Sequence, residues 1–336
     1  MGWGPGTRDL RSGGAGASSI PRARTFAASR PTATFAAPGL QAARVDRSME
    51  GGLSEIEEGP APRGPLVTPY ELVFGEGGLE ERVFPDILAE AEAQAEDPAR
   101  RERFGFLSVV ADALRAMVPD EATAEVLEEY RLLFYHGFNF WRFGRRLYVL
   151  EPATARYLVE AAPRMSGWEL KLPYPSVYVQ LPPRLFWASI AIDAPPEPVD
   201  GFFAIQSQGI DPLGPGFSDL QVLMVLGVRR ERAGFSVIPF DTEVGPGIPT
   251  DWAEAPGREG APDFANILPG GEIAGLYSIL TNTEALKLLA RALWYIDTQS
   301  GEIPSETAPE RRAGEHEGSL PLSRLPFQRV RLADAG

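Results

Sequence analysis

The chain has 336 residues, 44% of them hydrophobic, which is enough for one large domain or two average ones. It contains no cysteine, which excludes disulfides, thiolate metal sites and a cysteine nucleophile, and its two histidines exclude a histidine-rich metal site. The formal net charge is −14, with +5 on residues 1–48 and therefore −19 on the rest, and so acidic a body disfavours broad nucleic-acid binding.

The first 64 residues are predicted to lack packed structure. Residues 1–48 are rich in Ala, Gly, Ser and Arg without a hydrophobic period, as in an organelle transit peptide or a disordered extension. The composition changes sharply at Met49, where "MEGGLSEIEEGPAPRG" begins, so Met49 is a possible true start and 1–48 a mis-set start. We expect a single domain over residues 65–300 and a flexible tail over 301–336.

The first part of this domain is predicted to be helical, because apolar residues recur there at three- and four-residue spacing. The expected helices cover residues 84–97, residues 97–119 and a stretch from about Glu121 to a C-cap at Gly137. A further short helix begins at Pro152 and ends before Pro163.

After residue 144 the hydrophobic period changes to two, which is typical of strands. The expected strands are 145–150, 176–181, 185–192, 201–208, 219–228 and 234–240, and short turns separate most of them. Residues 241–272 read as a long loop, and a helix capped by Thr281 or Asn282 follows. The predicted fold class is therefore α+β: a helical N-terminal half, an antiparallel meander of about five to six strands, and a C-terminal amphipathic helix packed on the sheet.

The stretch "LKLPYPSVYVQLPP", residues 170–183, combines an alternating strand pattern with prolines near both ends. Proline cannot donate to a strand ladder, so the four prolines fix where strand 176–181 begins and ends. This pattern predicts a half-buried edge strand that a partner polypeptide could approach. An ordinary edge strand without a partner is the alternative.

One short motif points to metal chemistry. Glu169-Leu170-Lys171 has the E-x-K spacing of metal-dependent nucleases, in which a carboxylate holds the cation and lysine steadies developing charge. Such a site also needs an aspartate on a neighbouring strand, whereas Asp120 is the nearest upstream and falls at a helix boundary. A nuclease or hydrolase using Glu169 and Lys171 is therefore kept as the alternative function.

The remaining polar residues do not form a recognisable active site. His136 lies among aromatic and arginine residues, which fits either base stacking or a helix end packed into the core, and His316 lies in the predicted tail. No nucleophile motif G-x-S-x-G accompanies them. A group of acids falls near predicted turns and fits no calcium loop: Asp193, Glu197, Asp200, Asp211 and Asp219. We expect no cofactor and no metal.

Four segments carry a resemblance. "RRLYVLEPATARYLVEAAP", "LKLPYPSVYVQLP", "VDGFFAI" and "ALKLLARALWYIDTQSGEI" resemble the type V-A anti-CRISPR protein that blocks biosynthesis of the effector nuclease, and its bacterial and phage homologues. The likeness covers about half of the chain. The matching residues are Leu172, Pro173, Tyr178, Val179, Gly201, Phe202, Phe203, Ala204 and Ile205. The family often ends in a basic, His/Trp-rich tail, from which "SLPLSRLPFQRVRLADAG" departs.

The resemblance implies a non-enzymatic regulatory protein, encoded by a mobile element or its bacterial host, that binds another polypeptide. The expected partner-binding residues are Pro173, Tyr174, Tyr178, Phe202 and Phe203. No apolar run approaches the roughly 18 residues that a membrane span needs, so we expect a cytoplasmic protein. A domain with a purely structural role stays open, and neither the partner nor the oligomeric state follows from the sequence.

Overall fold

The computed structural model describes only part of the chain. The described residues are 64–75, 79–95, 107–118, 122–160, 163–165, 167–189, 195–206, 220–230, 234–241, 253, 282–298, 303–307 and 321–332. The predicted leader up to residue 63, Met49 included, lies outside them. So do nearly all of the predicted loop 241–272 and residues 308–320 of the predicted tail.

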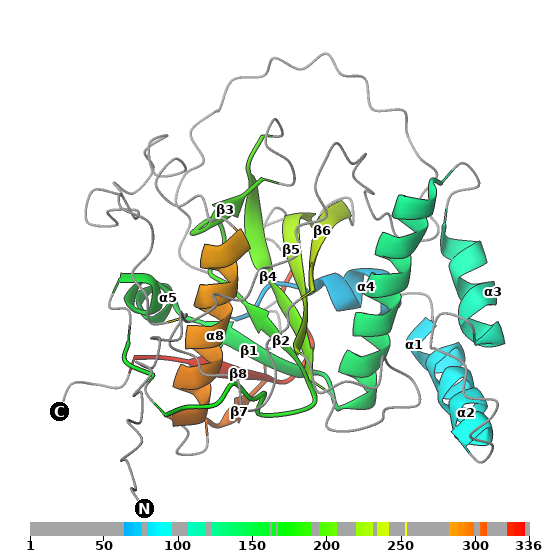
Figure 1. Ribbon diagram of the computed structural model, residues 1–336, viewed down its shortest axis with the longest axis horizontal. Coiled ribbons are helices and arrows are strands. Elements are labelled where there is room, and N and C mark those ends of the chain that lie inside the picture. Colours follow the sequence, from blue (N-terminus) through cyan, green and yellow to red (C-terminus); the bar gives the residue numbers. More distant parts are fainter. Residues whose placement is uncertain are drawn as a thin grey trace, which may run out of the picture.

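A mixed sheet lies between two layers of helices (Figure 1). Its strands are β1 (Arg146–Leu150), β2 (Ser176–Gln180), β3 (Trp187–Ala188), β4 (Glu197–Gln206), β5 (Leu220–Arg229), β6 (Gly234–Asp241), β7 (Ser305–Glu306) and β8 (Phe327–Val330). They follow the order β6-β5-β4-β2-β1-β8-β7, and β3 pairs with β4 beside this path. The α+β class is confirmed, but the simple meander is not, because β1 pairs in parallel with both β2 and β8.

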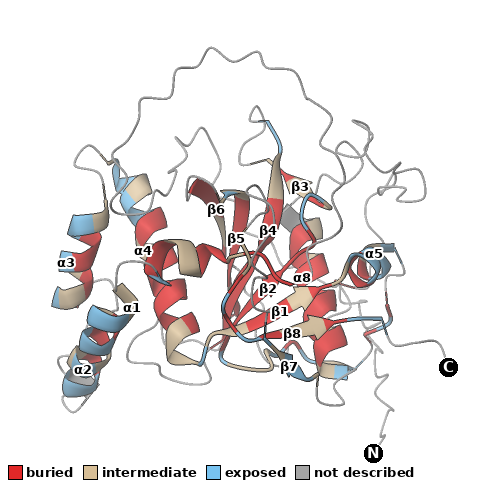
Figure 2. Cartoon of the chain, turned by 180° about the vertical axis from the view of Figure 1, so that it is seen from behind, coloured by how far each residue is buried: buried red, intermediate tan, exposed pale blue. Residues whose placement is uncertain are grey.

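The helices bury one face each against this sheet or against one another. They are the π-helix η1 (Glu71–Gly75), α1 (Leu79–Arg82), α2 (Phe84–Ala95), α3 (Ser108–Met117), α4 (Ala124–Arg142), α5 (Pro152–Glu160) and α8 (Asn282–Thr298). The helix α4 covers one sheet face and carries α2 and α3 outside it, while α8 and α5 cover the other face. Figure 2 shows α4 and α8 largely buried, with exposed residues on the outer sides of α2 and α3.

The strand β2 is central, so the predicted edge strand at 176–181 is wrong. It pairs in parallel with β1 and antiparallel with β4, and all five of its residues are buried. The prolines do bound the strand, but its neighbours in the sheet come from distant parts of the chain. The half-buried pattern is also wrong: Val177 and Val179 pack on the α8 side, while Tyr178 packs on the α4 side.

The C-terminal segment 321–332 belongs to the sheet, which corrects the predicted flexible tail. The strand β8 pairs in parallel with β1, with Leu147 opposite Phe327 and Leu150 opposite Val330. Phe327 and Val330 are each 1% exposed, so the short run "FQRV" places two apolar side chains in the core. Its partner strand is about 180 residues earlier, which the local pattern cannot show.

Gly137 is not a C-cap, because α4 continues to Arg142 and is capped by Phe143. Its role is close packing: a Cβ added at Gly137 would lie 2.2 Å from Cε2 of Phe74 on η1. The helix instead ends before Gly144, whose φ of +87° is the left-handed conformation that glycine tolerates best.

We predict that Gly137→Ala lowers the free energy of unfolding by about 1–3 kcal/mol through overpacking against Phe74, although alanine is the better helix former by about 1 kcal/mol. Urea denaturation of both proteins measures this. In Phe74→Leu protein the same substitution should lower the free energy of unfolding by less, because leucine is smaller than phenylalanine and leaves room for the added methyl group. A Gly137→Ala protein as stable as the wild type contradicts the packing argument.

Candidate functional site

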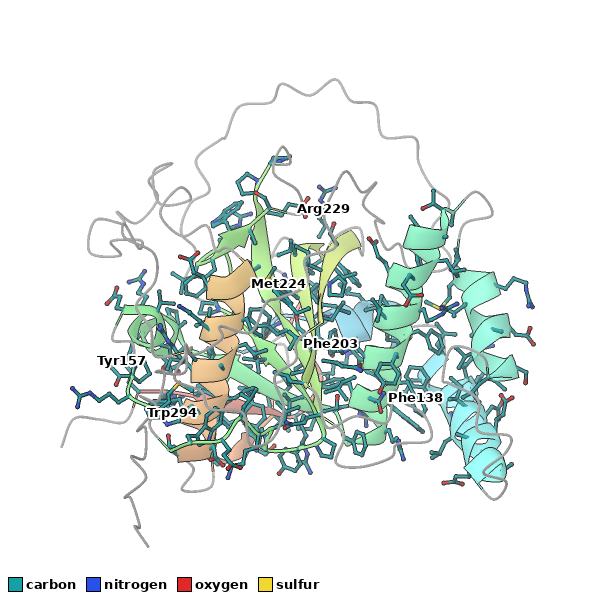
Figure 3. The ribbon with its side chains drawn as sticks, viewed as in Figure 1. Phe138, Tyr157, Phe203, Met224, Arg229 and Trp294 are labelled. Atoms are coloured by element: carbon teal, nitrogen blue, oxygen red, sulfur yellow. The ribbon has the colours of Figure 1, made fainter. Side chains whose placement is uncertain are left out.

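Three of the five predicted partner-binding residues are core residues. Tyr178, Phe202 and Phe203 are all 0% exposed. Tyr178 and Phe203 pack together under α4 with ring centroids 4.4 Å apart, and Phe202 lies on the opposite face under α8. In Figure 3 Phe203 lies within the sheet, between Phe138 on α4 and Met224 on β5. These three residues therefore offer no surface to a partner.

Pro173 and Tyr174 keep part of their surface accessible. The buried side chain of Gln206, at the end of β4, holds the main chain of this segment. The N–H of Leu172 donates to Gln206 Oε1 (3.0 Å), and Gln206 Nε2 donates to the carbonyl of Leu170 (3.4 Å). The guanidinium carbon of Arg146 lies 4.2 Å from the centroid of the Tyr174 ring, a cation–π distance.

The E-x-K motif is not assembled into a metal site. Lys171 Nζ lies 3.2 Å from Asp297 Oδ2 near the end of α8, and Trp168 Nε1 donates to the same oxygen (2.9 Å). Glu169 is exposed. Within the described ranges no group of three or more His, Asp or Glu side chains could hold a metal ion. Lys171 thus forms an ion pair with Asp297 on α8, and Trp168 donates a hydrogen bond to the same carboxylate.

Four half-buried side chains that pack against the α8 side of the core form what we call the aromatic surface, and Trp168 among them bonds to Asp297: Trp168, Leu172, Tyr174 and Trp294. Trp294 precedes Asp297 by one helical turn and so lies on the same side of α8. Figure 3 shows Trp294 on α8, on the side of the sheet away from Phe138. Sequence reasoning found Tyr174 here but missed both tryptophans, because a local pattern cannot bring residue 168 to residue 297.

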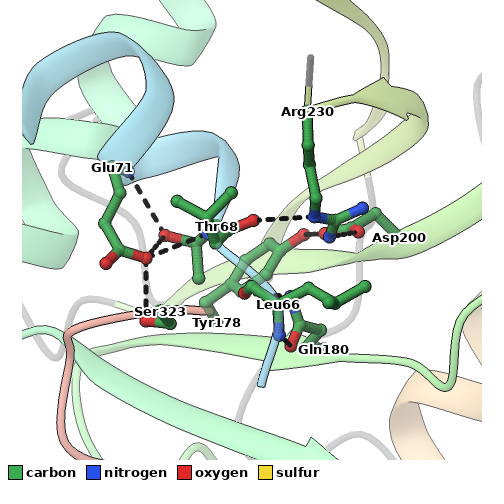
Figure 4. Close-up of polar contacts among 9 residues, drawn as sticks. Leu66, Thr68, Glu71, Tyr178, Gln180, Asp200, Arg230 and Ser323 are labelled. Carbon is green, nitrogen blue, oxygen red and sulfur yellow. Dashed lines mark hydrogen bonds and ion pairs between the residues drawn. The ribbon is translucent and has the colours of Figure 1, made fainter. Parts of the chain in front are cut away.

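A buried ion pair forms the polar centre of the molecule (Figure 4). Arg230 Nη2 donates to Asp200 Oδ1, and the Tyr178 hydroxyl donates to Asp200 Oδ2 (2.6 Å). The side chains of Arg230 and Asp200 are 7% and 8% exposed. Burial, followed by the charge of Asp200, raises the pKa of Tyr178 well above its ordinary value, so the hydroxyl keeps its proton.

The same centre clamps residues 64–75, which we call the arm. The Gln180 side chain bonds both main-chain groups of Leu66: its Oε1 accepts from the N–H (3.1 Å), and its Nε2 donates to the carbonyl (3.0 Å). Arg230 Nε donates to the carbonyl of Val67 (3.2 Å). Because both side chains bond to main-chain atoms, they fix Leu66 and Val67, the part of the arm that precedes η1.

A carboxylate ties the arm to the C-terminal segment. Glu71 Oε2 accepts from the Thr68 N–H (2.9 Å), the Thr68 hydroxyl (2.9 Å) and the Ser323 hydroxyl (2.8 Å), while its Oε1 accepts from the Arg324 N–H (2.8 Å).

The acidic residues that the sequence places near turns are only partly described by the structure. Asp200 lies within β4, not at a turn, and Asp193, Asp211 and Asp219 lie outside the described residues.

His136 is a core residue on α4. It is 2% exposed, its ring centroid lies 6.3 Å from that of Phe203, and its Nδ1 has no hydrogen-bond partner in the part of the chain that the structure describes. Burial lowers the pKa of His136 from 6.5 to about 3, so the imidazole is neutral near pH 7. This confirms the core interpretation and gives no surface for base stacking; His316 lies outside the described residues.

Comparisons with protein families, curated proteins and solved structures find no match for this chain. No helix of the described part is long and apolar enough to cross a membrane. The site is therefore interpreted from its own geometry.

We predict that the stability of this protein falls as the pH drops below about 6.5, partly through His136. The unfolded chain binds a proton at His136 near pH 6.5, and the folded chain only near pH 3, so acid favours unfolding. Between pH 8 and pH 5 this residue should account for about 2 kcal/mol.

Denaturation of wild-type and His136→Phe protein across this pH range measures the difference. The substituted protein should show the shallower pH dependence by that amount. Equal slopes for the two proteins would mean that His136 gains protons in the folded state as readily as in the unfolded one.

Proposed function

We propose that this chain is a non-enzymatic regulatory protein that binds a partner polypeptide, in the manner that its resemblance to type V-A anti-CRISPR proteins implies. The residues that carry the resemblance, such as Tyr178 and Phe202, are buried in the central strands. The resemblance therefore concerns residues in the core of the sheet, and the docking surface has to be sought elsewhere. The proposed docking surface is the aromatic surface, and its half-buried tryptophans are the observation that carries the proposal.

Tryptophan and tyrosine are the side chains most enriched at the energetic centres of protein interfaces. Trp168 and Trp294 are anchored by packing on the core, so little conformational entropy remains to be lost when a partner covers them. Gln206 holds the intervening main chain at Leu170 and Leu172. The surface is thus preorganised, and its three rings are half-buried.

The charges of this surface indicate which partner it fits. Lys171 is paired with Asp297, and the guanidinium of Arg146 lies over Tyr174. Because these charges already have partners within the chain, we propose that the bound polypeptide presents apolar side chains to the rings. Such binding depends only weakly on salt, unlike binding steered by unpaired charges.

Affinity capture with the full chain tests this function. We expect a specific protein to be retained from cells that naturally express the chain. Trp294→Ala and Tyr174→Ala should each weaken the purified interaction by about tenfold or more, as for truncated interface centres. Leu127→Ala is the matched control, because Leu127 is 36% exposed on α4, on the other side of the sheet.

Each variant is first checked for wild-type thermal stability. Two results would contradict docking at the aromatic surface. One is undiminished binding by both the Trp294 and Tyr174 variants, and the other is an equal loss of binding in the Leu127 variant. A partner whose affinity collapses between low and moderate salt would contradict its apolar chemistry.

A further inference from the structure

We propose that Arg146 binds a carboxylate, which an acidic side chain of the partner polypeptide supplies when it covers the aromatic surface. This inference rests on the proposed function, because it names a group that the partner presents at the same surface. It adds one charged contact to the apolar contacts already proposed there.

Arg146 begins β1 and lies on the sheet face that carries the aromatic surface. In the parallel register it is opposite Val177 of β2, which packs on the α8 side. Side chains alternate along a strand, and Tyr148, two residues further, also packs on the α8 side. The side chain of Arg146 therefore lies on the same face as Tyr174, and its guanidinium carbon is 4.2 Å from the centroid of that ring.

The guanidinium of Arg146 has no carboxylate partner among the residues that the structure describes. Its Nε is buried and makes no hydrogen bond. The Tyr174 ring meets the positive charge from one side, but the N–H groups lie in the guanidinium plane and need acceptors of their own. Other arginines of the described part do form ion pairs with carboxylates: Arg115, Arg131, Arg145, Arg230, Arg329 and Arg331.

A carboxylate is the acceptor that suits this group best. A buried donor without an acceptor is unfavourable, and a charged donor more so. The two oxygens of a carboxylate can accept two N–H groups of one guanidinium at the same time. Gly144 leaves this side of Arg146 without a covering side chain, since an added Cβ there would lie 3.6 Å from Nε and 4.0 Å from Nη2.

The partner segment that fits is therefore apolar with one acidic side chain. Its apolar side chains contact the rings, and its Asp or Glu pairs with Arg146 beside Tyr174. Lys171 does not offer the same contact, because its Nζ lies 3.2 Å from Asp297 Oδ2. One such ion pair adds only a modest salt dependence to an otherwise apolar contact.

Two short peptides test this assignment with the full chain. The probe is N-acetyl-Phe-Glu-amide, and its control is N-acetyl-Phe-Gln-amide, which has nearly the same shape without the charge. Each is titrated into protein labelled with 15N in its arginines, and NMR follows the Nε–H signal of Arg146. That signal is assigned as the one lost in Arg146→Lys protein.

We expect the Glu peptide to shift the Arg146 signal with a Kd on the order of 1 mM, and the Gln peptide to bind at least about fivefold more weakly. In Arg146→Lys protein, followed at the main-chain amide of Tyr174, this preference should fall at least about threefold, because an ammonium lacks the planar pair of donors. Arg115→Lys is the matched control, at a side chain 75% exposed on α3, and should keep the preference.

Three results on wild-type protein, which do not depend on a variant folding, would overturn the proposal. They are equal affinity for the two peptides, an Arg146 signal that does not move up to about 50 mM peptide, and acetate binding as tightly as the Glu peptide. The last would mean that the site takes a small free anion. An equal loss of preference in the Arg146 and Arg115 variants would also overturn it.

The proposed function fails on different evidence. It fails if no partner is captured, or if the partner binds the Trp294 and Tyr174 variants normally, whatever the peptides show. A captured partner that needs Trp294, together with equal affinity for the two peptides, would overturn the carboxylate contact alone.

Discussion

The ion pair between Asp200 and Arg230 is the constraint on which the rest of the structure depends. Two charges can be buried this deeply only if their remaining hydrogen-bonding groups also find partners. Tyr178 on β2 supplies one partner and the Val67 carbonyl of the arm another, so the pair joins two strands, the β5–β6 turn and the arm. Gly201 makes the approach possible, since a Cβ there would lie 2.3 Å from the Val179 carbonyl oxygen and 3.0 Å from the Tyr178 ring.

This constraint explains why a strand with alternating polar side chains lies in the middle of the sheet. Tyr178 and Gln180 point toward the α4 side, where both are buried and hydrogen-bonded, while Val177 and Val179 pack under α8. Because β2 is buried and paired on both sides, the partner contact that we propose falls to the aromatic surface around it. A buried glutamine clamps main-chain groups both beside that surface, where Gln206 holds Leu172, and at the arm, where Gln180 holds Leu66.

Much of the secondary structure could be predicted from the sequence, because helices and strands follow local periodicity. The strand at 145–150 and the helix at 84–97 appear as β1 and α2 with small changes of boundary. Strand neighbours could not be predicted, since Leu147 meets Phe327 across the sheet and no local pattern records that. The buried polar centre and its contact with the arm were missed for the same reason: Gln180 and Leu66 are 114 residues apart, and Arg230 carries no motif.

The central claim is that the arm belongs to the buried core and is clamped there by polar side chains of the sheet. Native-state hydrogen exchange at the Leu66 amide, which donates to Gln180 Oε1, tests it most directly. The account predicts that this amide exchanges as slowly as that of Tyr178 in β2, and that both follow the global free energy of unfolding. Exchange at Leu66 close to the rate of an unprotected peptide, with Tyr178 still protected, would contradict it.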